Sequence, residues 1–233
     1  RGISSWDPTP TVYYSYPTDN YADGYRYLMK GVVVTAGSNQ LDLDLPSAKL
    51  HGDITLNGAT DLPTSTGGSN IGLYLVDRDT GSRQLIHSVD FQYQGGNPYT
   101  VTASDKKYAT TVLPGTYDLL YTRGISSWDP TPTVYYTYPS DNYADGYRYL
   151  VKNVTIFAGN NVLDVNLPST KIAGAVTLNG QALPTSTGGS NIGLYLVDEE
   201  TRARTLIHSV DFQYQGGNPY TVSPSDSLYG ATV

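Results

Sequence analysis

The stretch RGISSWDPTPTVYY occupies residues 1–14 and recurs without change at residues 123–136, an offset of 122 positions. A second stretch, DNYADGYRYL, recurs with the same offset at residues 19–28 and 141–150. Beyond Asn179-Gly180 the offset is 121, because the second copy is one residue shorter there. A repeat of this length far exceeds the roughly 20–50 residues of a solenoid unit. The sequence therefore predicts tandem modules that each fold on their own.

The LPSAK and LPSTK segments mark the predicted module boundaries, since a strand-like run ends at Pro46 or Pro168 and a new strand follows. On this division residues 49–170 are one complete module. Residues 1–48 are the C-terminal part of a preceding repeat, and residues 171–233 are the N-terminal part of a following one.

The two outer parts together lack a counterpart of residues 113–122, LPGTYDLLYT. A head-to-tail composite of residues 171–233 with residues 1–48 of another chain would lack that strand and expose its core. The sequence therefore predicts a longer natural chain, with an intact mass above 25.2 kDa.

Alternating apolar and polar residues dominate the complete module, and this period of two is typical of half-buried strands. The expected strands cover residues 53–57, 71–76, 85–93, 117–121 and 154–158. Asn57-Gly58 and Asn179-Gly180 favour type I′ hairpins, and Pro114-Gly115 favours a type II turn. Seven to nine short strands in about 120 residues indicate an all-β fold of tandem antiparallel β-sandwich modules, immunoglobulin-like or prealbumin-like.

Several motifs of the complete module carry a resemblance to known families. GDITLNG, IGLYLVD, VLPGTYDLLYT and the closing VTIFAGNNVLDVNLP resemble the carboxypeptidase-regulatory-like, transthyretin-like and CnaB-like sandwiches, and similar repeats occur in large bacterial cell-surface proteins. The resemblance implies an extracellular or cell-surface location and a role as a stalk, adhesin or fibre module. It carries no catalytic chemistry.

Composition excludes several classes of function. The net charge of −7 disfavours nucleic acid, because phosphate backbones require a basic face. No apolar run approaches the roughly 18 residues of a membrane helix, so no membrane insertion is expected in this segment. The absence of cysteine removes disulfides, thiolate metal sites and cysteine nucleophiles. No cofactor is expected.

His87, Ser88 and Asp90, repeated as His208, Ser209 and Asp211, offer the residue types of a hydrolase triad. In a strand, however, His87 shares a face with Leu85 and Val89, whereas Ser88 and Asp90 point to the opposite face. The sequence therefore predicts a packed histidine and a protein that is not an enzyme.

Aspartates in the DNYADG motif are the weak candidates for a metal site. Asp19, Asp23, Asp141 and Asp145 echo the start of a calcium loop, but tyrosine replaces the third-position ligand. Glu199 and Glu200 are the only glutamates, so no bidentate ligand follows. The alternative is an Asx-rich surface turn.

Lys49 and Lys171 open a module while Asp42 and Asp164 lie near its end, which is similar to the partners of a CnaB-like isopeptide bond. The complete module lacks the glutamate that normally catalyses such a bond, so no cross-link is expected.

Tyrosine outnumbers phenylalanine by 22 to 3, and tyrosine suits half-exposed surfaces. The candidate aromatic contact surface comprises Trp6, Tyr13, Tyr14, Tyr16, Trp128, Tyr135, Tyr136 and Tyr138. Either these rings pack across strands, or they stack on sugars.

Two functions follow as hypotheses. The first is a non-catalytic structural repeat of an extracellular fibre, filament or stalk, whose partners are neighbouring repeats or chains. The second is an adhesive module that binds surface glycans through its tyrosines, with avidity from repetition.

Overall fold

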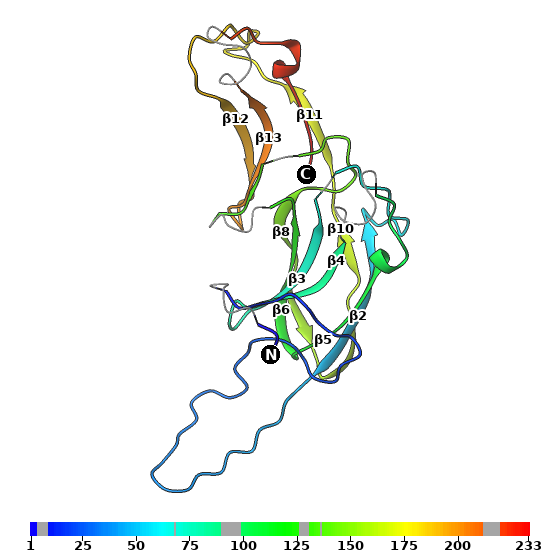
Figure 1. The fold of residues 1–233 in the computed structure, drawn as a ribbon, viewed down its shortest axis with the longest axis vertical. Coiled ribbons are helices and arrows are strands. Elements are labelled where there is room, and N and C mark those ends of the chain that lie inside the picture. Colours follow the sequence, from blue (N-terminus) through cyan, green and yellow to red (C-terminus); the bar gives the residue numbers. More distant parts are fainter. Residues whose placement is uncertain (4–8, 68, 90–98, 126–130, 136, 212–219) are drawn as a thin grey trace.

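The computed structural model describes residues 1–3, 9–67, 69–89, 99–125, 131–135, 137–211 and 220–233. Its regular elements are strands and two short 3₁₀ helices, and the prediction of an all-β chain is confirmed (Figure 1). Trp6, Trp128, Tyr136 and Asp90 lie outside the described residues.

Eight strands build the central sandwich, and they run from residue 48 to residue 167. They are β2 (Ala48–Leu56), β3 (Ile71–Asp77), β4 (Arg83–Val89), β5 (Lys107–Val112), β6 (Gly115–Arg123), β8 (Gly146–Ile156), β9 (Gly159–Val162) and β10 (Val165–Leu167). The 3₁₀ helix η1 (Ser104–Lys106) precedes β5.

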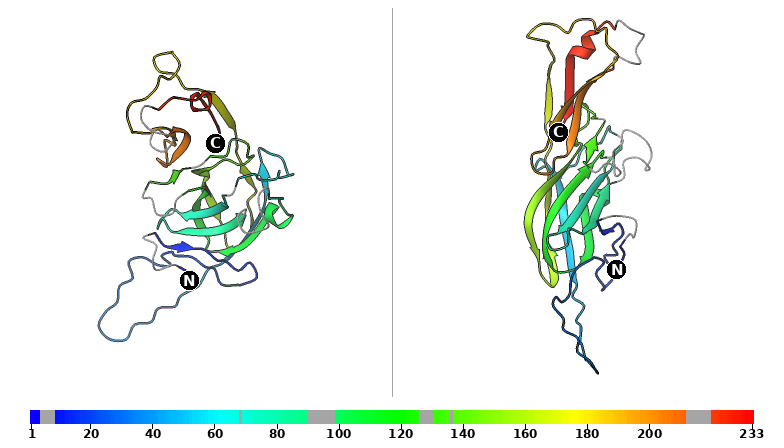
Figure 2. Two further views of the ribbon diagram at one scale, coloured as in Figure 1. Left: turned by 45° about the horizontal axis from the view of Figure 1, so that its top comes forward. Right: turned by 90° about the vertical axis from the view of Figure 1, so that its left-hand side faces the viewer.

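Two sheets form this sandwich (Figures 1 and 2). One has the order β1-β4-β3-β6-β8, where β1 (Thr11–Val12) comes from the N-terminal part of the chain. The other has the order β10-β2-β5, and β9 also pairs with β2. The pairings within the first sheet are antiparallel except for that of β1, whereas β9 and β10 run parallel to β2.

Inward-facing side chains of both sheets form one core. Leu50 and Ile54 of β2 pack with Leu73 and Leu75 of β3 and with Leu119 of β6, and all five are buried. The period of two in the sequence places these residues on the inner faces, so burial of apolar surface drives the two sheets together.

The predicted strands are confirmed with small shifts at their ends. Residues 71–76 and 117–121 lie wholly within β3 and β6. Asn57 begins the turn after β2, and β8 ends at Ile156. β4 ends at Val89, and residues 90–93 of the predicted strand lie outside the described residues.

The predicted hairpin turns are borne out at both asparagine-glycine pairs. Asn57 and Gly58 have φ values of 51° and 81°, as a type I′ turn requires, and Leu56 and Ala59 exchange backbone hydrogen bonds of 3.0 and 2.9 Å. The prediction of a type II turn at Pro114-Gly115 was wrong, because Gly115 has a nearly extended φ of 158°. Here β5 pairs with β2 and β6 pairs with β3, so the chain crosses between the sheets.

The C-terminal part contains β11 (Lys171–Ala175), β12 (Ile192–Val197), β13 (Arg204–Val210), the 3₁₀ helix η2 (Pro224–Ser227) and β14 (Leu228–Thr232). β11 pairs with β14, and β12 pairs with β13, in the same register as their copies in the central sandwich. These strands lie beyond the central sandwich along the long axis of the molecule, and residues 25–45 form an extended loop at the other end (Figure 1).

Candidate functional site at the repeat junction

Residues 124–145 connect β6 to β8 by way of the next repeat. Within them β7 (Thr133–Val134) adds to the edge of β13 as a short parallel strand. The backbone N–H of Arg204 donates to the carbonyl of Pro132 at 2.9 Å. One sheet of the C-terminal part therefore has the order β12-β13-β7, with its last strand supplied by the preceding repeat.

The N-terminal part makes the same junction with the central sandwich. β1 adds to β4 in parallel, and the Arg83 N–H donates to the Pro10 carbonyl at 2.9 Å. Arg83 is the counterpart of Arg204, and Pro10 is the counterpart of Pro132. The two copies of the junction thus agree in strand pairing and in hydrogen bonding.

Threonine hydroxyls provide further matching contacts. Thr111 Oγ1 donates to the Asp19 carbonyl at 2.9 Å, and its counterpart Thr232 Oγ1 donates to the Asp141 carbonyl at 3.0 Å. An ion pair also recurs with different residues, Lys30 with Asp79 in one junction and Lys152 with Glu200 in the other. Thr111 and Thr232 are both buried, so water competes little for these bonds.

A buried arginine holds the connecting segment to its own repeat. Arg123 Nη2 lies 2.5 Å from Asp141 Oδ2, and Nη1 lies 3.3 Å from Asp145 Oδ1. The same guanidinium donates to the carbonyl oxygens of Ser69 and Tyr143. Arg123 is fully buried at the end of β6, and such a charge is tolerated only with partners of this kind.

Asp141 contacts both repeats at once. Its carboxylate accepts hydrogen bonds from the Ser65 hydroxyl and from the backbone N–H groups of Thr66 and Gly67, all in the central sandwich. Its backbone carbonyl accepts the bond from Thr232 of the next repeat. Displacement of either repeat therefore strains contacts to the other.

The two buried carboxylates have opposite pKa shifts. Burial raises the pKa of Asp145 to about 6, because the Arg123 charge offsets only part of the desolvation. Burial also acts to raise the pKa of Asp141, but the charge and hydrogen bond of Arg123 and the backbone donors lower it overall. Asp141 is thus the firmly ionised partner of Arg123.

The raised pKa predicts a pH dependence of stability. Ionising Asp145 costs the folded state free energy, so its unfavourable contribution is absent below about pH 4 and complete above about pH 6. We expect the Asp145→Asn variant to gain stability relative to wild type as pH rises through this window. Urea unfolding from pH 4 to 8 measures the difference, with the exposed Asp53→Asn as control. A difference that is constant with pH would contradict the prediction.

The calcium candidates have arginine partners in the structure. Asp141 and Asp145 flank Arg123, and Asp19 and Asp23 flank its copy Arg1 at 2.5 and 3.4 Å. This role in ion pairs differs from the metal site suggested by the sequence. Over the described part of the chain, no group of three or more histidine, cysteine, aspartate or glutamate side chains is placed to hold a metal ion.

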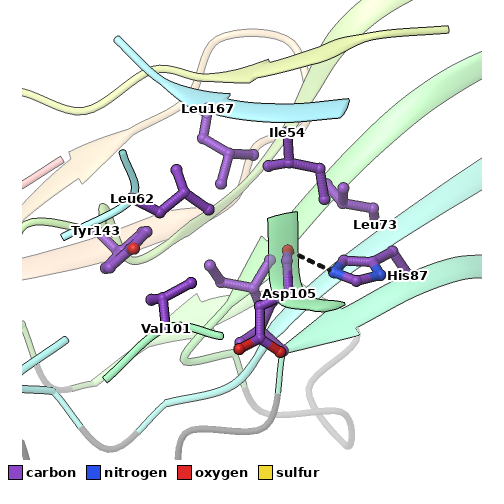
Figure 3. A pocket seen from close by; sticks show the side chains of 10 residues that line it. Ile54, Leu62, Leu73, His87, Val101, Asp105, Tyr143 and Leu167 are labelled. Atoms are coloured by element: carbon purple, nitrogen blue, oxygen red, sulfur yellow. Dashed lines mark hydrogen bonds between the residues drawn. The ribbon is translucent and has the colours of Figure 1, made fainter. Parts of the chain in front are cut away.

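His87 lies in the sandwich and contacts no catalytic partner among the described residues. Its Nε2 lies 3.0 Å from the Asp105 backbone carbonyl, so this nitrogen carries the proton (Figure 3). His208 repeats the contact with Asp226 at 2.7 Å. Burial lowers the pKa of His87, which keeps the ring neutral. A small void of about 10 Å³ beside His87 is at the lower limit of the space that can hold one water molecule.

The prediction that Leu85 and His87 point to the same face of their strand was wrong. β3 and β4 shift register between Leu73 and Tyr74, and this bulge leaves Ile86 unpaired and buried. Val89 is also buried and lines the same void as His87, whereas Ser88 is exposed. A one-residue bulge inverts the inward and outward alternation of the side chains that precede it in the strand.

The lysine and aspartate at the module ends contact different partners. Lys49 Nζ donates to the carbonyls of Pro17 and Asp19 and to Thr111 Oγ1, so it belongs to the junction. Asp164 Oδ1 accepts from the Asp53 backbone N–H instead. Lys171 and Asp42 are exposed.

Tyrosines of the candidate aromatic surface are open to solvent on the connecting segments. Tyr14 is 78% exposed, and Tyr13, Tyr16, Tyr135 and Tyr138 are also exposed. The structure thus leaves these rings beside the junction, on residues that link one repeat to the next.

Sequence reasoning missed Arg123 and the Ser65–Gly67 turn. In the sequence Arg123 stands out only as the first residue of the recurring stretch 123–136, and no motif marks Ser65 or Gly67 as binding groups. A signal was present, because an arginine and two aspartates recur together at a fixed spacing in a chain with few charges. Nothing in the spacing, however, shows that the three side chains meet.

No family model matches the chain, and no curated protein matches it. Two solved structures are similar. One is a proposed carbohydrate-binding protein from Bacteroides uniformis, with 14% identity over 81% of this chain and 79% of that one and a TM-score of 0.30. The other is a proposed adhesin from Bacteroides ovatus, with 10% identity over 81% and 69% and a TM-score of 0.29. These scores are too low to support an argument about function.

The described residues contain no helix that is long and apolar enough to cross a membrane.

Proposed function

We propose that the chain is a non-catalytic structural repeat of an extracellular or cell-surface filament or stalk, built from immunoglobulin-like sandwiches of about 122 residues. The observation that carries this proposal is the junction, which forms twice with the same strand pairing and the same backbone acceptors. A contact that repeats with the sequence can extend through any number of repeats.

The geometry suits the transmission of force along the array. Residues 124–145 are held in their own repeat by Arg123 and in the next by β7 and Thr232. Each hydrogen bond contributes about 1 kcal/mol, and several of them act together across one segment. Successive repeats therefore have a fixed orientation instead of swinging about the short linker at Pro168.

The orientation can be tested by removing hydrogen bonds of the junction. Arg204→Pro deletes the N–H that reaches Pro132 and the guanidinium that donates to Thr133 Oγ1, and it is tolerated in β13 because residue 204 is the first of that strand. Thr232→Val deletes the hydroxyl that reaches Asp141. Together they remove about 2 kcal/mol from the junction. Spin labels on Val162→Cys and Leu228→Cys, both at exposed positions, report the distance between the repeats.

We expect a narrow distance distribution for the native junction and a broad one for the double variant. The control pair Arg204→Ala and Thr177→Val loses the guanidinium contact with Thr133 but keeps the Arg204 N–H and the Thr232 hydroxyl, and it should retain the narrow distribution. A distribution that is already broad in the native junction would contradict the proposed rigid array.

The exposed tyrosines favour a second function, the binding of surface glycans. Tyr14 and Tyr16 present open rings on which a sugar could stack, beside the junction between the N-terminal part and the central sandwich. Calorimetric titration with soluble polysaccharides tests this function. Binding that is lost in Tyr14→Ala with Tyr16→Ala would support it, and unchanged binding in that variant would place the contact elsewhere.

A further inference from the structure

A second arginine, Arg26, reaches from the N-terminal part of the chain into the central sandwich. Its Nε atom lies 3.5 Å from Asp77 Oδ2, at the end of β3. Its Nη1 atom donates to the carbonyl of Pro114, and the centre of its guanidinium lies 5.8 Å from the centre of the Tyr117 ring. One guanidinium therefore contacts a carboxylate, a backbone acceptor and an aromatic face, and each of these suits its planar charged group.

Asp77 is fixed in place with one carboxylate oxygen facing the arginine. Its side chain is 3% exposed. Its Oδ1 atom accepts from the backbone N–H groups of Asp79 and Thr80, which holds the carboxylate in the turn after β3. Its Oδ2 atom is buried and accepts no hydrogen bond within the described residues. A buried carboxylate oxygen without a donor is costly, so the charge of Arg26 offsets a cost inside the central sandwich.

Gly115 makes room for the arginine. A Cβ atom at this position would overlap the guanidinium of Arg26. The glycine of the Pro114-Gly115 pair therefore permits a close approach between repeats instead of the predicted turn. Asp77, Pro114, Gly115 and Tyr117 together form an arginine socket, whose charge and shape fit one guanidinium.

The complete sandwich directs the counterpart arginine toward the next repeat. Arg148 lies near the start of β8 and is the counterpart of Arg26, and Asp198 is the counterpart of Asp77. Burial acts to raise the pKa of Asp198, but hydrogen bonds within its own turn and the charge of Arg148 lower it overall. An arginine held in a folded β8 therefore acts on the aspartate of the following repeat, as Arg26 does.

The carbonyl before each arginine makes a matching contact. Thr80 Oγ1 donates to the Tyr25 carbonyl at 3.2 Å, and its counterpart Thr201 Oγ1 donates to the Tyr147 carbonyl at 3.0 Å. These bonds tie the backbone next to the arginine to the turn that follows β3 or β12. The arginine is therefore carried to the same turn at both junctions.

We propose that each repeat takes the arginine of the preceding repeat into its arginine socket, and that this contact sets the direction of the array. Arginine and socket lie at opposite ends of one sheet, since Arg148 pairs with Tyr121 near the end of β6, whereas Tyr117 lies near its start. A contact between two different surfaces joins like units head to tail only. This inference rests on the proposed structural role and names the residues that recognise the neighbouring repeat.

Exchange of a single amide measures the contact. The Arg83 N–H donates to the Pro10 carbonyl across this junction, and the Arg204 N–H donates to the Pro132 carbonyl across the next one. Arg26→Met is expected to accelerate hydrogen exchange of the Arg83 N–H by about tenfold or more, and to leave the Arg204 N–H of the same molecule unchanged. Arg26→Lys keeps the charge without the planar fork, so we expect it to recover only part of the protection.

A double-mutant cycle links the effect to the arginine socket. Asp77→Asn keeps the Oδ1 acceptor of its turn but loses the charge that faces Arg26. We expect this variant to accelerate exchange of the Arg83 N–H to a similar extent, and the double variant to exchange no faster than either single one. Lys30→Met is the matched control, because Lys30 belongs to the same segment but pairs with Asp79 at an exposed site. Its effect should stay below about threefold.

Unchanged exchange of the Arg83 N–H in Arg26→Met, an equal effect of Lys30→Met, or additive effects in the double variant would overturn the arginine socket. The spin labels at residues 162 and 228 report the other junction and do not involve Arg26. A broad native distribution there would contradict the structural array itself. A narrow distribution together with unchanged exchange in Arg26→Met would remove the arginine socket alone.

Discussion

Replacing Arg123 with methionine is expected to destabilise the central sandwich by about 3–5 kcal/mol, because it leaves two buried carboxylates without their cation. Asp141 and Asp145 are both fully buried beside the guanidinium. The carbonyls of Ser69 and Tyr143 lose their donor as well. Hydrogen exchange of peptides from β3 and β6, measured by mass spectrometry at pH 7, reports the change in the relevant part of the chain.

Arg78→Met is the control for this experiment. Arg78 pairs with Asp118 at 3.2 Å on the surface of the same sheet, where an ion pair contributes about 0–1 kcal/mol. Equal effects of the two replacements would show that the buried cluster contributes no more than an exposed pair. A second variant, Arg123→Lys, keeps the charge but not the fork of donors, and is expected to recover only part of the stability.

The second large effect is expected at Leu75, where truncation to alanine should cost the central sandwich about 2–5 kcal/mol. Leu75 lies in β3 and is completely buried between the two sheets. Its counterpart Leu196 has the same neighbours in sequence but is 42% exposed in β12. Leu196→Ala is therefore expected to cost less than about 1 kcal/mol, since little apolar surface returns to water.

Hydrogen exchange of peptides from β3 and β12 in the two variants compares the same substitution in two settings. A similar loss at both positions would mean that residues 171–233 complete a core in solution.

The all-β class, the strand positions and the two hairpin turns were predictable from the sequence, because each depends on neighbours along the chain. Alternation sets which side chains face inward, and an asparagine followed by glycine suits the φ values of a type I′ turn. The repeat was equally predictable, since it requires only a comparison of residue identities along the chain. The bulge at Ile86 and the crossover at Pro114 could not be predicted from the sequence, because each depends on the strand that lies alongside.

The sequence by itself therefore determined a chain of repeating β modules with the strands in their observed places. Only the tertiary structure decided how the repeats connect, because Arg123, Asp141 and Ser65 are distant in sequence and meet only when both sheets have formed. The same holds for β7 and Thr232, whose partners belong to another repeat. Local patterns report burial and turns, whereas contacts between repeats depend on which surfaces the folded modules leave free.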